Sequence, residues 1–535
     1  MSIDARIEAT RLLLAQQGQA IPPDDLGDVL AAAEDLSQAV ADAAGSLSML
    51  QIAEPFSVSM QECARPPLPG SGALPNTCAG ADQARNSEEW VRDAISRIDT
   101  IAPGSLAWRE VYAGSALSRA QQLDSERMQG HVRSPLHGMP AGLKDMLEQE
   151  GRVAGWGGIL RTHLPPATQT ATAVQRLERA GVVVLGTQHM AEFAMSPTGF
   201  NANYGPGRNP WNDEHVSGGS SSGAGMSVGA GHVPLAIGSD TGGSVRLPAA
   251  LCGVTGLKPT QHRISVAGAM PLCPSLDCLG PLGSSVQVVA WAYAAMAGPD
   301  PLDPTCLSAQ PIIPDWKVPA SEFVVGIPRL AQGPALSADM LRVFDETTQL
   351  LKDLGVRCVE VALPDLDLLG RLSSVMLASE SAAIHRGWLT TQADRYGRQV
   401  RRRLSRGLLT GGMDYYDTLR LRTPLLKTFM EQTLGNVDVL MLPVAPDVAP
   451  CVANTVGTDE RQLEKNFSLL SYWTRGINYL GVPALSVPAG VGAKGLPLGV
   501  QFIGAPLAEE RILALGHIFQ QHSDWHTATT QRPLS

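Results

Sequence analysis

The chain contains 535 residues, 44% of them hydrophobic and 17% charged. This is the composition of a folded globular protein, and it excludes disorder over most of the chain. The 41 Lys and Arg residues against 51 Asp and Glu residues give a net charge of −10, which disfavours tight binding to nucleic acid or another polyanion. A chain of this length is expected to form roughly two to four domains or one unusually large one.

The cysteines and the N-terminus favour a cytoplasmic protein. The eight cysteines are scattered, with no Cys-x-x-Cys pair and no Cys/His cluster at metal-ligand spacing, which is typical of a reducing compartment and predicts no structural zinc site. The apolar run Leu12-Leu13-Leu14 is too short for a signal sequence. No stretch reaches about 18 apolar residues, so we expect no membrane-spanning segment and no membrane partner.

Residues 1–60 are predicted to form helices. A first amphipathic segment carries Ile7 and the leucines at 12–14, and a second follows Pro22-Pro23. The second segment has apolar residues at helical spacing, namely Leu26, Val29, Leu30, Ala33, Leu36 and Val40. This spacing is typical of one apolar helix face. We expect a helical hairpin that packs this face on the main body, or on a second copy of the chain in a homodimer.

Residues 61–86 are rich in Pro, Gly, Ser and Asn, which predicts a linker before a catalytic domain over 87–535. In that domain, helix-like segments alternate with short apolar strands; 172–180, for example, is followed by the β-branched run 182–185. The alternation favours an α/β fold in which helices cover both faces of a sheet. Residues 363–475 are more helical and more charged, which predicts a subdomain inserted between two late strands.

Two motif matches fail their structural context. Gly490-Val-Gly492-Ala-Lys-Gly495 fits the dinucleotide-binding pattern G-x-G-x-x-G, but Pro497 prevents a helix from starting there, so a hairpin turn is predicted. Gly219-Ser-Ser-Ser-Gly223 fits the nucleophile elbow G-x-S-x-G, but a polar loop precedes it instead of an apolar strand. Neither match therefore supports a function.

The segment Asp240-Thr-Gly-Gly-Ser244 is a candidate reactive site. Thr241, Gly242 and Gly243 can bring bare backbone close to a substrate, and consecutive N–H groups in such a turn can form an oxyanion hole. Ser244 follows directly and could attack a carbonyl group held there.

A serine nucleophile needs a base, and a lysine is the better candidate in this chain. None of the eleven histidines sits in a motif beside a suitably spaced carboxylate, so a Ser-His-Asp site is supported only by the presence of its residue types. Lys144 ends a small, apolar, tightly turning segment, whose environment would desolvate an ammonium and lower its pKa. Lowering that pKa to about 7–8 costs roughly 4 kcal/mol, which a large core can sustain.

Three ordered motifs resemble the amidase signature family. They are Gly142-Leu-Lys144-Asp145, Gly218-Gly-Ser220-Ser-Ser-Gly223 and Asp240-Thr-Gly-Gly-Ser244-Val-Arg246. Ser220 lies 76 residues after Lys144, and Ser244 lies 24 residues after Ser220, as in the family pattern. The resemblance covers roughly residues 87 to 520 of the chain.

The resemblance implies a Ser-cisSer-Lys triad and an acyl-enzyme intermediate. Ser244 would be the nucleophile, Ser220 would follow a cis peptide bond and relay the proton, and Lys144 would be the final base. Singly, these residues could be a turn serine, a helix cap and a surface lysine, but their joint spacing favours the triad. The resemblance also implies a single large mixed sheet between helices, and no metal or organic cofactor.

The substrate pocket is predicted from position in the motifs and loops. The candidate wall residues are Ala194, Met195, Ser196, Gly218 and Gly219, with further walls near Trp156 and in 363–475. Asp240 and Arg246 are expected to brace the loop between them instead of binding substrate. Cys252 is expected to be a small buried hydrophobic residue.

Residues 21–56 resemble the small helical companion subunit of some multi-subunit amidases, notably those acting on carboxylated ureas and the glutamine-dependent amidotransferases. In this chain the companion would be fused to the catalytic part.

The expected function is hydrolysis of a small or medium-sized carboxamide, or of a urea or carbamate relative. The expected partner of the site is therefore a small-molecule substrate. The alternative is the glutaminase subunit of a glutamine-dependent tRNA amidotransferase, against which the net charge of −10 and the built-in helical segment both count. A degenerate scaffold without activity is disfavoured because all three triad residues are present.

Overall fold

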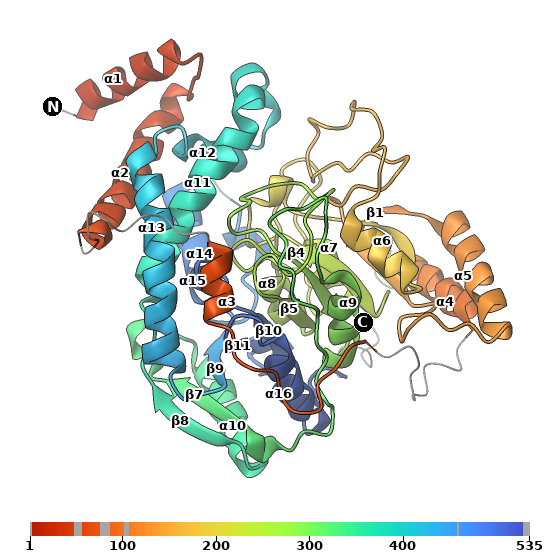
Figure 1. The fold of residues 1–535 in the computed structure, drawn as a ribbon. Coiled ribbons are helices and arrows are strands. Elements are labelled where there is room, and N and C mark those ends of the chain that lie inside the picture. Colours follow the sequence, from red (N-terminus) through yellow and green to blue (C-terminus); the bar gives the residue numbers. More distant parts are fainter. Residues whose placement is uncertain are drawn as a thin grey trace.

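A single mixed β-sheet runs through the structure, a computed structural model that describes residues 3–45, 47, 56–74, 86–100, 106–456 and 460–527 (Figure 1). The sheet has eleven strands in the order β1-β3-β2-β4-β6-β5-β10-β11-β9-β7-β8. The strands are β1 (Trp108–Val111), β2 (Pro140–Lys144), β3 (Val183–Gln188), β4 (Leu235–Ser239), β5 (Thr255–Lys258), β6 (Leu279–Gly283), β7 (Val324–Pro328), β8 (Arg357–Val361), β9 (Val439–Pro443), β10 (Ala484–Val491) and β11 (Pro497–Gly504). The predicted α/β fold with one large mixed sheet is confirmed.

Parallel pairs lie toward the two ends of the strand order. β2 pairs in parallel with β3 and with β4, and β7 pairs in parallel with β8 and with β9. The other neighbouring strands are antiparallel. β10 and β11 form a hairpin across the G-x-G-x-x-G match, so the prediction of a turn at that motif is confirmed.

Sixteen α-helices occur in the described ranges (Figure 1). They are α1 (Ile3–Gln16), α2 (Pro23–Ala44), α3 (Phe56–Glu62), α4 (Ser87–Thr100), α5 (Ala113–Met128), α6 (Thr172–Arg179), α7 (Ser222–Gly229), α8 (Arg246–Cys252), α9 (Val286–Met296), α10 (Ala338–Asp353), α11 (Leu366–Thr391), α12 (Arg398–Arg406), α13 (Gly412–Thr428), α14 (Glu460–Leu470), α15 (Tyr472–Leu480) and α16 (Glu509–Gln521). None of these helices combines the length and apolarity needed to cross a bilayer.

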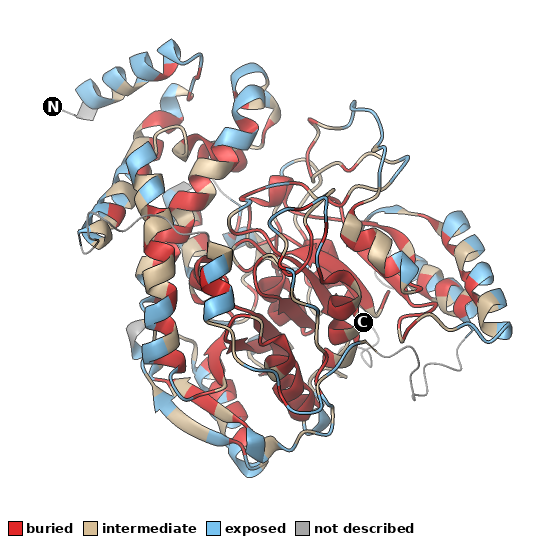
Figure 2. Cartoon of the chain, in the orientation of Figure 1, coloured by how far each residue is buried: buried red, intermediate tan, exposed pale blue. Residues whose placement is uncertain are grey.

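Side chains of β4 show that helices cover both faces of the sheet. Leu235 and Ile237 belong to one core cluster together with residues of α9 and α16. Ala236, between them, belongs to another cluster with Ala224 of α7 and Ala249 of α8. Since successive strand residues point to opposite faces, α9 and α16 cover one face while α7 and α8 cover the other. The sheet between them is the most deeply buried part of the chain in Figure 2.

Helix α2 packs along α11, α12 and α13 of the same chain (Figure 1). Leu26 and Val29 form a cluster with Leu408 and Leu409, and Val40 joins a second cluster with residues of α11 and α15. The apolar face predicted for this helix therefore packs on the same chain.

Helix α1 differs in part from its predicted pattern. Leu14 is buried and Ile7 packs beside it, whereas the side chains of Leu12 and Leu13 are 52% and 55% exposed. Residues seven apart share a helix face, while each single step turns by about 100°. Ile7 and Leu14 therefore face α2, and the two leucines before Leu14 point away.

The predicted linker contacts the predicted insertion, and the insertion contributes to the main sheet. Arg65, in the linker, donates hydrogen bonds to the carbonyl groups of Val437 and Gly435. Residues 75–85 of the linker lie outside the described residues. The segment 363–475 contains helices α11 to α14 but also β9, so it supplies one strand of the main sheet.

Candidate active site

Lys144 and Ser239 are the last residues of β2 and β4, two adjacent parallel strands. Parallel strands end at the same edge of a sheet, so the two side chains meet there. Ala141 and Leu143 of β2 face the core that contains α9 and α16. Lys144 therefore faces the opposite side, toward α7.

Ser220 meets Lys144 from the loop that leads into α7. Lys144 Nζ lies 2.7 Å from Ser220 Oγ and 2.8 Å from Ser239 Oγ. The peptide bond between Gly219 and Ser220 is cis. The Ser221 N–H donates to the Ser244 carbonyl at 3.3 Å, which joins this loop to the segment that follows β4.

Burial lowers the pKa of Lys144 to about 7. The side chain is fully buried, and removal from water penalises its charged form. The negative charges of Asp240 and Asp277 act in the opposite direction but only partly offset this effect. Near neutral pH a large fraction of this lysine is uncharged, so it can accept a proton from Ser220.

Asp240 fixes the loop between β4 and α8. Its carboxylate accepts hydrogen bonds from the N–H groups of Gly243 at 2.8 Å and Val245 at 3.1 Å. It also forms a fully buried ion pair with Arg246, at 3.0 Å. Burial alone would raise the pKa of Asp240, but the Arg246 guanidinium holds it well below its usual range. These contacts agree with the bracing role expected for the pair.

The turn over 241–243 is held on both sides. Gly243 has φ +123°, and a Cβ atom at this position would lie 2.3 Å from Thr474 Oγ1, so only glycine fits. Thr474 Oγ1 donates to the Gly242 carbonyl at 2.8 Å, and Thr241 Oγ1 donates to Asp277 at 2.6 Å. The backbone of this turn is therefore fixed before any substrate binds.

Two backbone donors of this turn are open. Within the described ranges, no group accepts a hydrogen bond from the N–H of Thr241 or of Gly242. The N–H of Gly243, which was also expected in the oxyanion hole, instead donates to the Asp240 carboxylate. Thr241 and Gly242 remain the candidate oxyanion donors.

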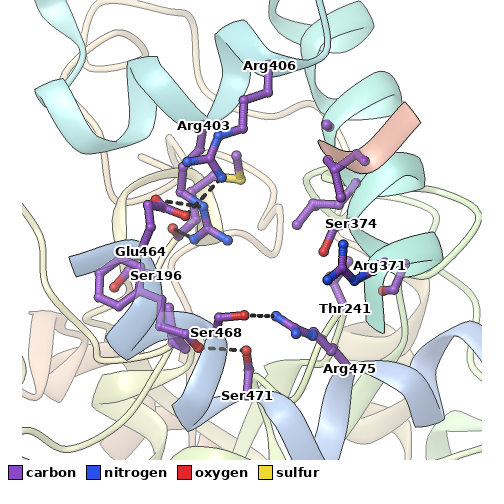
Figure 3. Close-up of a pocket in the computed structure, with 18 of the residues that line it drawn as sticks. Ser196, Thr241, Arg371, Ser374, Arg403, Arg406, Glu464, Ser468, Ser471 and Arg475 are labelled. Carbon is purple, nitrogen blue, oxygen red and sulfur yellow. Dashed lines mark hydrogen bonds and ion pairs between the residues drawn. The ribbon is translucent and has the colours of Figure 1, made fainter. Parts of the chain in front are cut away.

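A cavity of about 450 Å³ opens beside this turn. Ser244 is half-buried and lines it. The other lining residues are Ala32, Asp35, Leu36, Ala194, Met195, Ser196, Pro197, Thr241, Gly242, Leu247, Leu272, Asp367, Arg371, Ser373, Ser374, Leu377, Ala378, Arg403, Arg406, Glu464, Lys465, Phe467, Ser468, Ser471 and Arg475. In Figure 3, Arg371 and Arg475 lie on one side of the cavity, and Arg403, Arg406 and Glu464 on the other.

The structure brings some of the predicted wall residues to this cavity and not others. Ala194, Met195 and Ser196 line it, as expected. Gly218 and Gly219 do not, because Pro248 and Leu251 lie against Gly218, and the backbone of residue 199 lies against Gly219. Trp156 is also absent from the lining; it lies in an aromatic cluster with Trp388.

The charged walls of the cavity were not identified as individual residues from the sequence. Arg406 pairs with Glu464 at 2.9 Å, and Arg403 donates to the Met195 carbonyl. The three-residue spacing of Arg403 and Arg406 on α12 is a visible signal of a shared helix face. Their position beside the cavity follows only from how α11, α12 and α14 pack.

No group of three or more His, Cys, Asp or Glu side chains is placed to hold a metal ion in the part of the chain that the structure describes.

Comparison with known proteins identifies the family. The amidase family model matches residues 89–513. A glutamyl-tRNA(Gln) amidotransferase subunit from Neisseria meningitidis serogroup A is 36% identical over 436 residues, covering 77% of this chain and 89% of that protein.

Solved structures agree with this match. One, described as part of a vestigial protein complex that reveals the origins of an s-triazine catabolic enzyme, is 32% identical, with a TM-score of 0.75 over 83% of this chain and 96% of that one. The peptide amidase of Stenotrophomonas maltophilia is 26% identical, with a TM-score of 0.69 over 82% and 94% of the two chains. The chain belongs to the amidase signature family, whose members act on amide C–N bonds.

Proposed function

We propose that the chain hydrolyses the C–N bond of a carboxamide, or of a urea or carbamate relative, with Ser244 as nucleophile, Ser220 as proton relay and Lys144 as base. The observation that carries this proposal is the pair of Lys144 and Ser220, 2.7 Å apart, with the pKa of the lysine lowered to about 7. Ser244 lies in the adjoining cavity, where a substrate carbonyl can reach it.

The first half of the reaction forms an acyl-enzyme. Ser244 Oγ attacks the carbonyl carbon while its proton passes to Ser220, whose own proton passes to neutral Lys144. The carbonyl oxygen takes up the negative charge, which the N–H groups of Thr241 and Gly242 stabilise. The C–N bond then breaks, the nitrogen leaves with the proton returned from Lys144 through Ser220, and the acyl group stays on Ser244.

The second half repeats these proton transfers with water. A water molecule gives one proton to the same relay and attacks the acyl carbon, and the bond to Ser244 Oγ breaks as that oxygen recovers a proton. The products are ammonia or an amine, together with a carboxylic acid from a carboxamide, a carbamic acid from a urea or a carbonate monoester from a carbamate. Each step uses only groups of this chain, the substrate and water.

A second candidate function is the ammonia-releasing subunit of a tRNA-dependent amidotransferase. It is supported by curated relatives named as subunits of glutamyl-tRNA(Gln) amidotransferase, of which one is 36% identical to this chain. Amide hydrolysis is supported by the similarity to the peptide amidase of Stenotrophomonas maltophilia and by the cavity that Ser244 lines.

Ammonia and amine release from primary amides, anilides, ureas, carbamates and glutamine would separate the two functions. The purified chain is expected to turn over at least one of the first four classes without any other protein. Turnover of glutamine alone, rising when charged tRNA and partner subunits are added, would instead establish the second function. Gel filtration of the active species would show whether another subunit is present.

A further inference from the structure

Helix α2 reaches the active-site cavity. Its side chains Ala32, Asp35 and Leu36 line the same cavity as Ser244, although about 200 residues separate them in sequence. Both carboxylate oxygens of Asp35 lie 3.1 Å from Nη1 of Arg371 on α11. The N-terminal segment is therefore part of the wall of the site.

Acidic residues of α2 contact α11, α12 and α14, which are three of the four other helices that supply charged side chains to the cavity. Asp35 pairs with Arg371 of α11. Asp28 pairs with Arg402 of α12 at 2.8 Å and with Arg461 of α14 at 2.9 Å. The position of α2 is thus tied to the helices that carry Arg371, Arg403, Arg406 and Glu464.

A further contact of α2, made by Asp25, is buried and fixes the position of the helix along its axis. The Asp25 side chain is 2% exposed and faces three arginines of α12, Arg398, Arg401 and Arg402, at 3.1 to 3.4 Å. A buried carboxylate is costly without its partners. A shift of α2 by one turn, about 5.4 Å, would separate Asp25 from them, so the helix presents Ala32 and Leu36 to the cavity in one register.

The cavity is large enough to hold more of a substrate than its scissile amide group. Its volume of about 450 Å³ falls in the range of about 300–1,000 Å³ that is typical of sites for drug-sized ligands. A scissile amide group occupies only a small part of this space. The remaining space, lined in part by the apolar side chains of Ala32 and Leu36, suits a substituent that extends away from the reacting carbonyl.

We infer that α2 is a specificity-determining wall of the active site, and that its Ala32 and Leu36 side chains contact an uncharged aliphatic or aromatic substituent of the amide substrate. The buried contacts of Asp25 with the α12 arginines hold this wall in place, and Asp35 pairs with Arg371 beside Asp367. The inference rests on the proposed amide hydrolysis at Ser244.

The test compares Ala32→Trp with Ala31→Trp in the full-length protein. Ala31 is adjacent on α2, exposed, and outside the cavity lining. The probes are a short alkyl amide and a phenylalkyl amide with the same reacting group, chosen from those that the wild type hydrolyses. Ala32→Trp is expected to raise KM for the longer amide at least tenfold more than for the shorter one, with kcat changed less than KM. Ala31→Trp should leave both amides as in the wild type.

Equal effects of Ala32→Trp on both amides, or the same discrimination in Ala31→Trp, would overturn the inference. If Ala32→Trp does not fold, Leu36→Ala replaces it, and a change in KM confined to the longer amide is expected. Wild-type turnover distinguishes failure of the inference about α2 from failure of the proposed amide hydrolysis. A wild type that hydrolyses both amides, with variants that do not distinguish them, contradicts only the role of α2, whereas a wild type that hydrolyses no amide contradicts the proposed function and this inference with it.

Discussion

Lys144 Nζ lies 2.8 Å from the hydroxyl oxygen of Ser239, at the end of the neighbouring parallel strand. A neutral amine has two N–H donors and one lone pair. When Lys144 donates to Ser239, its lone pair is free to point toward Ser220, 2.7 Å away. Ser239 is therefore placed to set the orientation of the proposed base.

Lys144→Met should reduce kcat at least a thousandfold, because no other group takes the proton from Ser220. In the wild type, kcat/KM should rise with pH through an apparent pKa of about 7, since only the neutral lysine accepts a proton. Initial rates between pH 5 and 9 would check this. A flat profile, with the chemical step shown to limit the rate, would contradict the lysine base.

The same substitution should stabilise the fold. The pKa of Lys144 is lowered from 10.5 to about 7, so below pH 7 the folded protein carries a buried ammonium at a cost of about 5 kcal/mol. Between pH 7 and 10.5 the unfolded state binds more protons, and this cost declines as the pH rises. Urea unfolding should therefore show Lys144→Met more stable than wild type, by about 2–3 kcal/mol more at pH 6 than at pH 9. An advantage that does not depend on pH would indicate a lysine that is not desolvated.

Ser244→Ala should abolish hydrolysis with little change in stability. The hydroxyl is half-buried in a cavity, so its loss removes the nucleophile and little packing. Active-site labelling with a serine-reactive phosphonate, together with the thermal midpoint, would check both parts. Retention of more than about a thousandth of wild-type kcat, with contamination excluded, would rule out Ser244 as nucleophile.

Asp240→Asn should damage both stability and rate. The carboxylate accepts hydrogen bonds from three backbone N–H groups and neutralises Arg246, whose side chain is fully buried. Removing the charge leaves a buried guanidinium uncompensated, which costs about 3–5 kcal/mol. Denaturant unfolding measures this loss, and kcat should fall because the 241–243 turn loses its support. Wild-type stability in this variant would mean that Gln501, Asn478 and the Thr474 carbonyl satisfy Arg246 without Asp240.

Asp25→Asn should loosen the N-terminal helices. The three arginines around Asp25 lose their shared partner, and a cost of about 1–3 kcal/mol is expected. Limited proteolysis should then cleave within residues 1–64 faster than in the wild type. Asp42→Asn, at an exposed position on the same helix, is the matched control and should change stability by less than about 0.5 kcal/mol. Equal cleavage rates in both variants would mean that Asp25 does not hold α2.

The parts of the fold that follow from local sequence could be predicted. Ser244 follows Gly243 in the short segment after β4, and Lys144 ends β2 two residues after Gly142, so local composition already restricts the backbone near both residues. Ser239, by contrast, gives no signal of its own, since a serine at the end of a buried strand is common. The apolar spacing of α2 predicted the burial of Leu26 and Val29.

The walls of the cavity could not be predicted in the same way. Arg371, Arg403 and Arg475 come from three separate helices, and a charged side chain on an amphipathic helix is usually solvated. Asp35 shows the same limit, because it reads as one more polar residue on the outer face of α2. Only the packing of α2 on α11 turns that position toward Ser244.

Because α2 is covalently linked to the rest of the chain, its contribution to the site should not depend on the protein concentration. A separate helical subunit would leave the site as its concentration fell below its dissociation constant, and the rate per active site would fall with it. A tethered helix meets its docking surface at an effective concentration set by the linker, which does not change with the amount of protein. The specific activity of this chain should therefore stay constant from micromolar to picomolar enzyme.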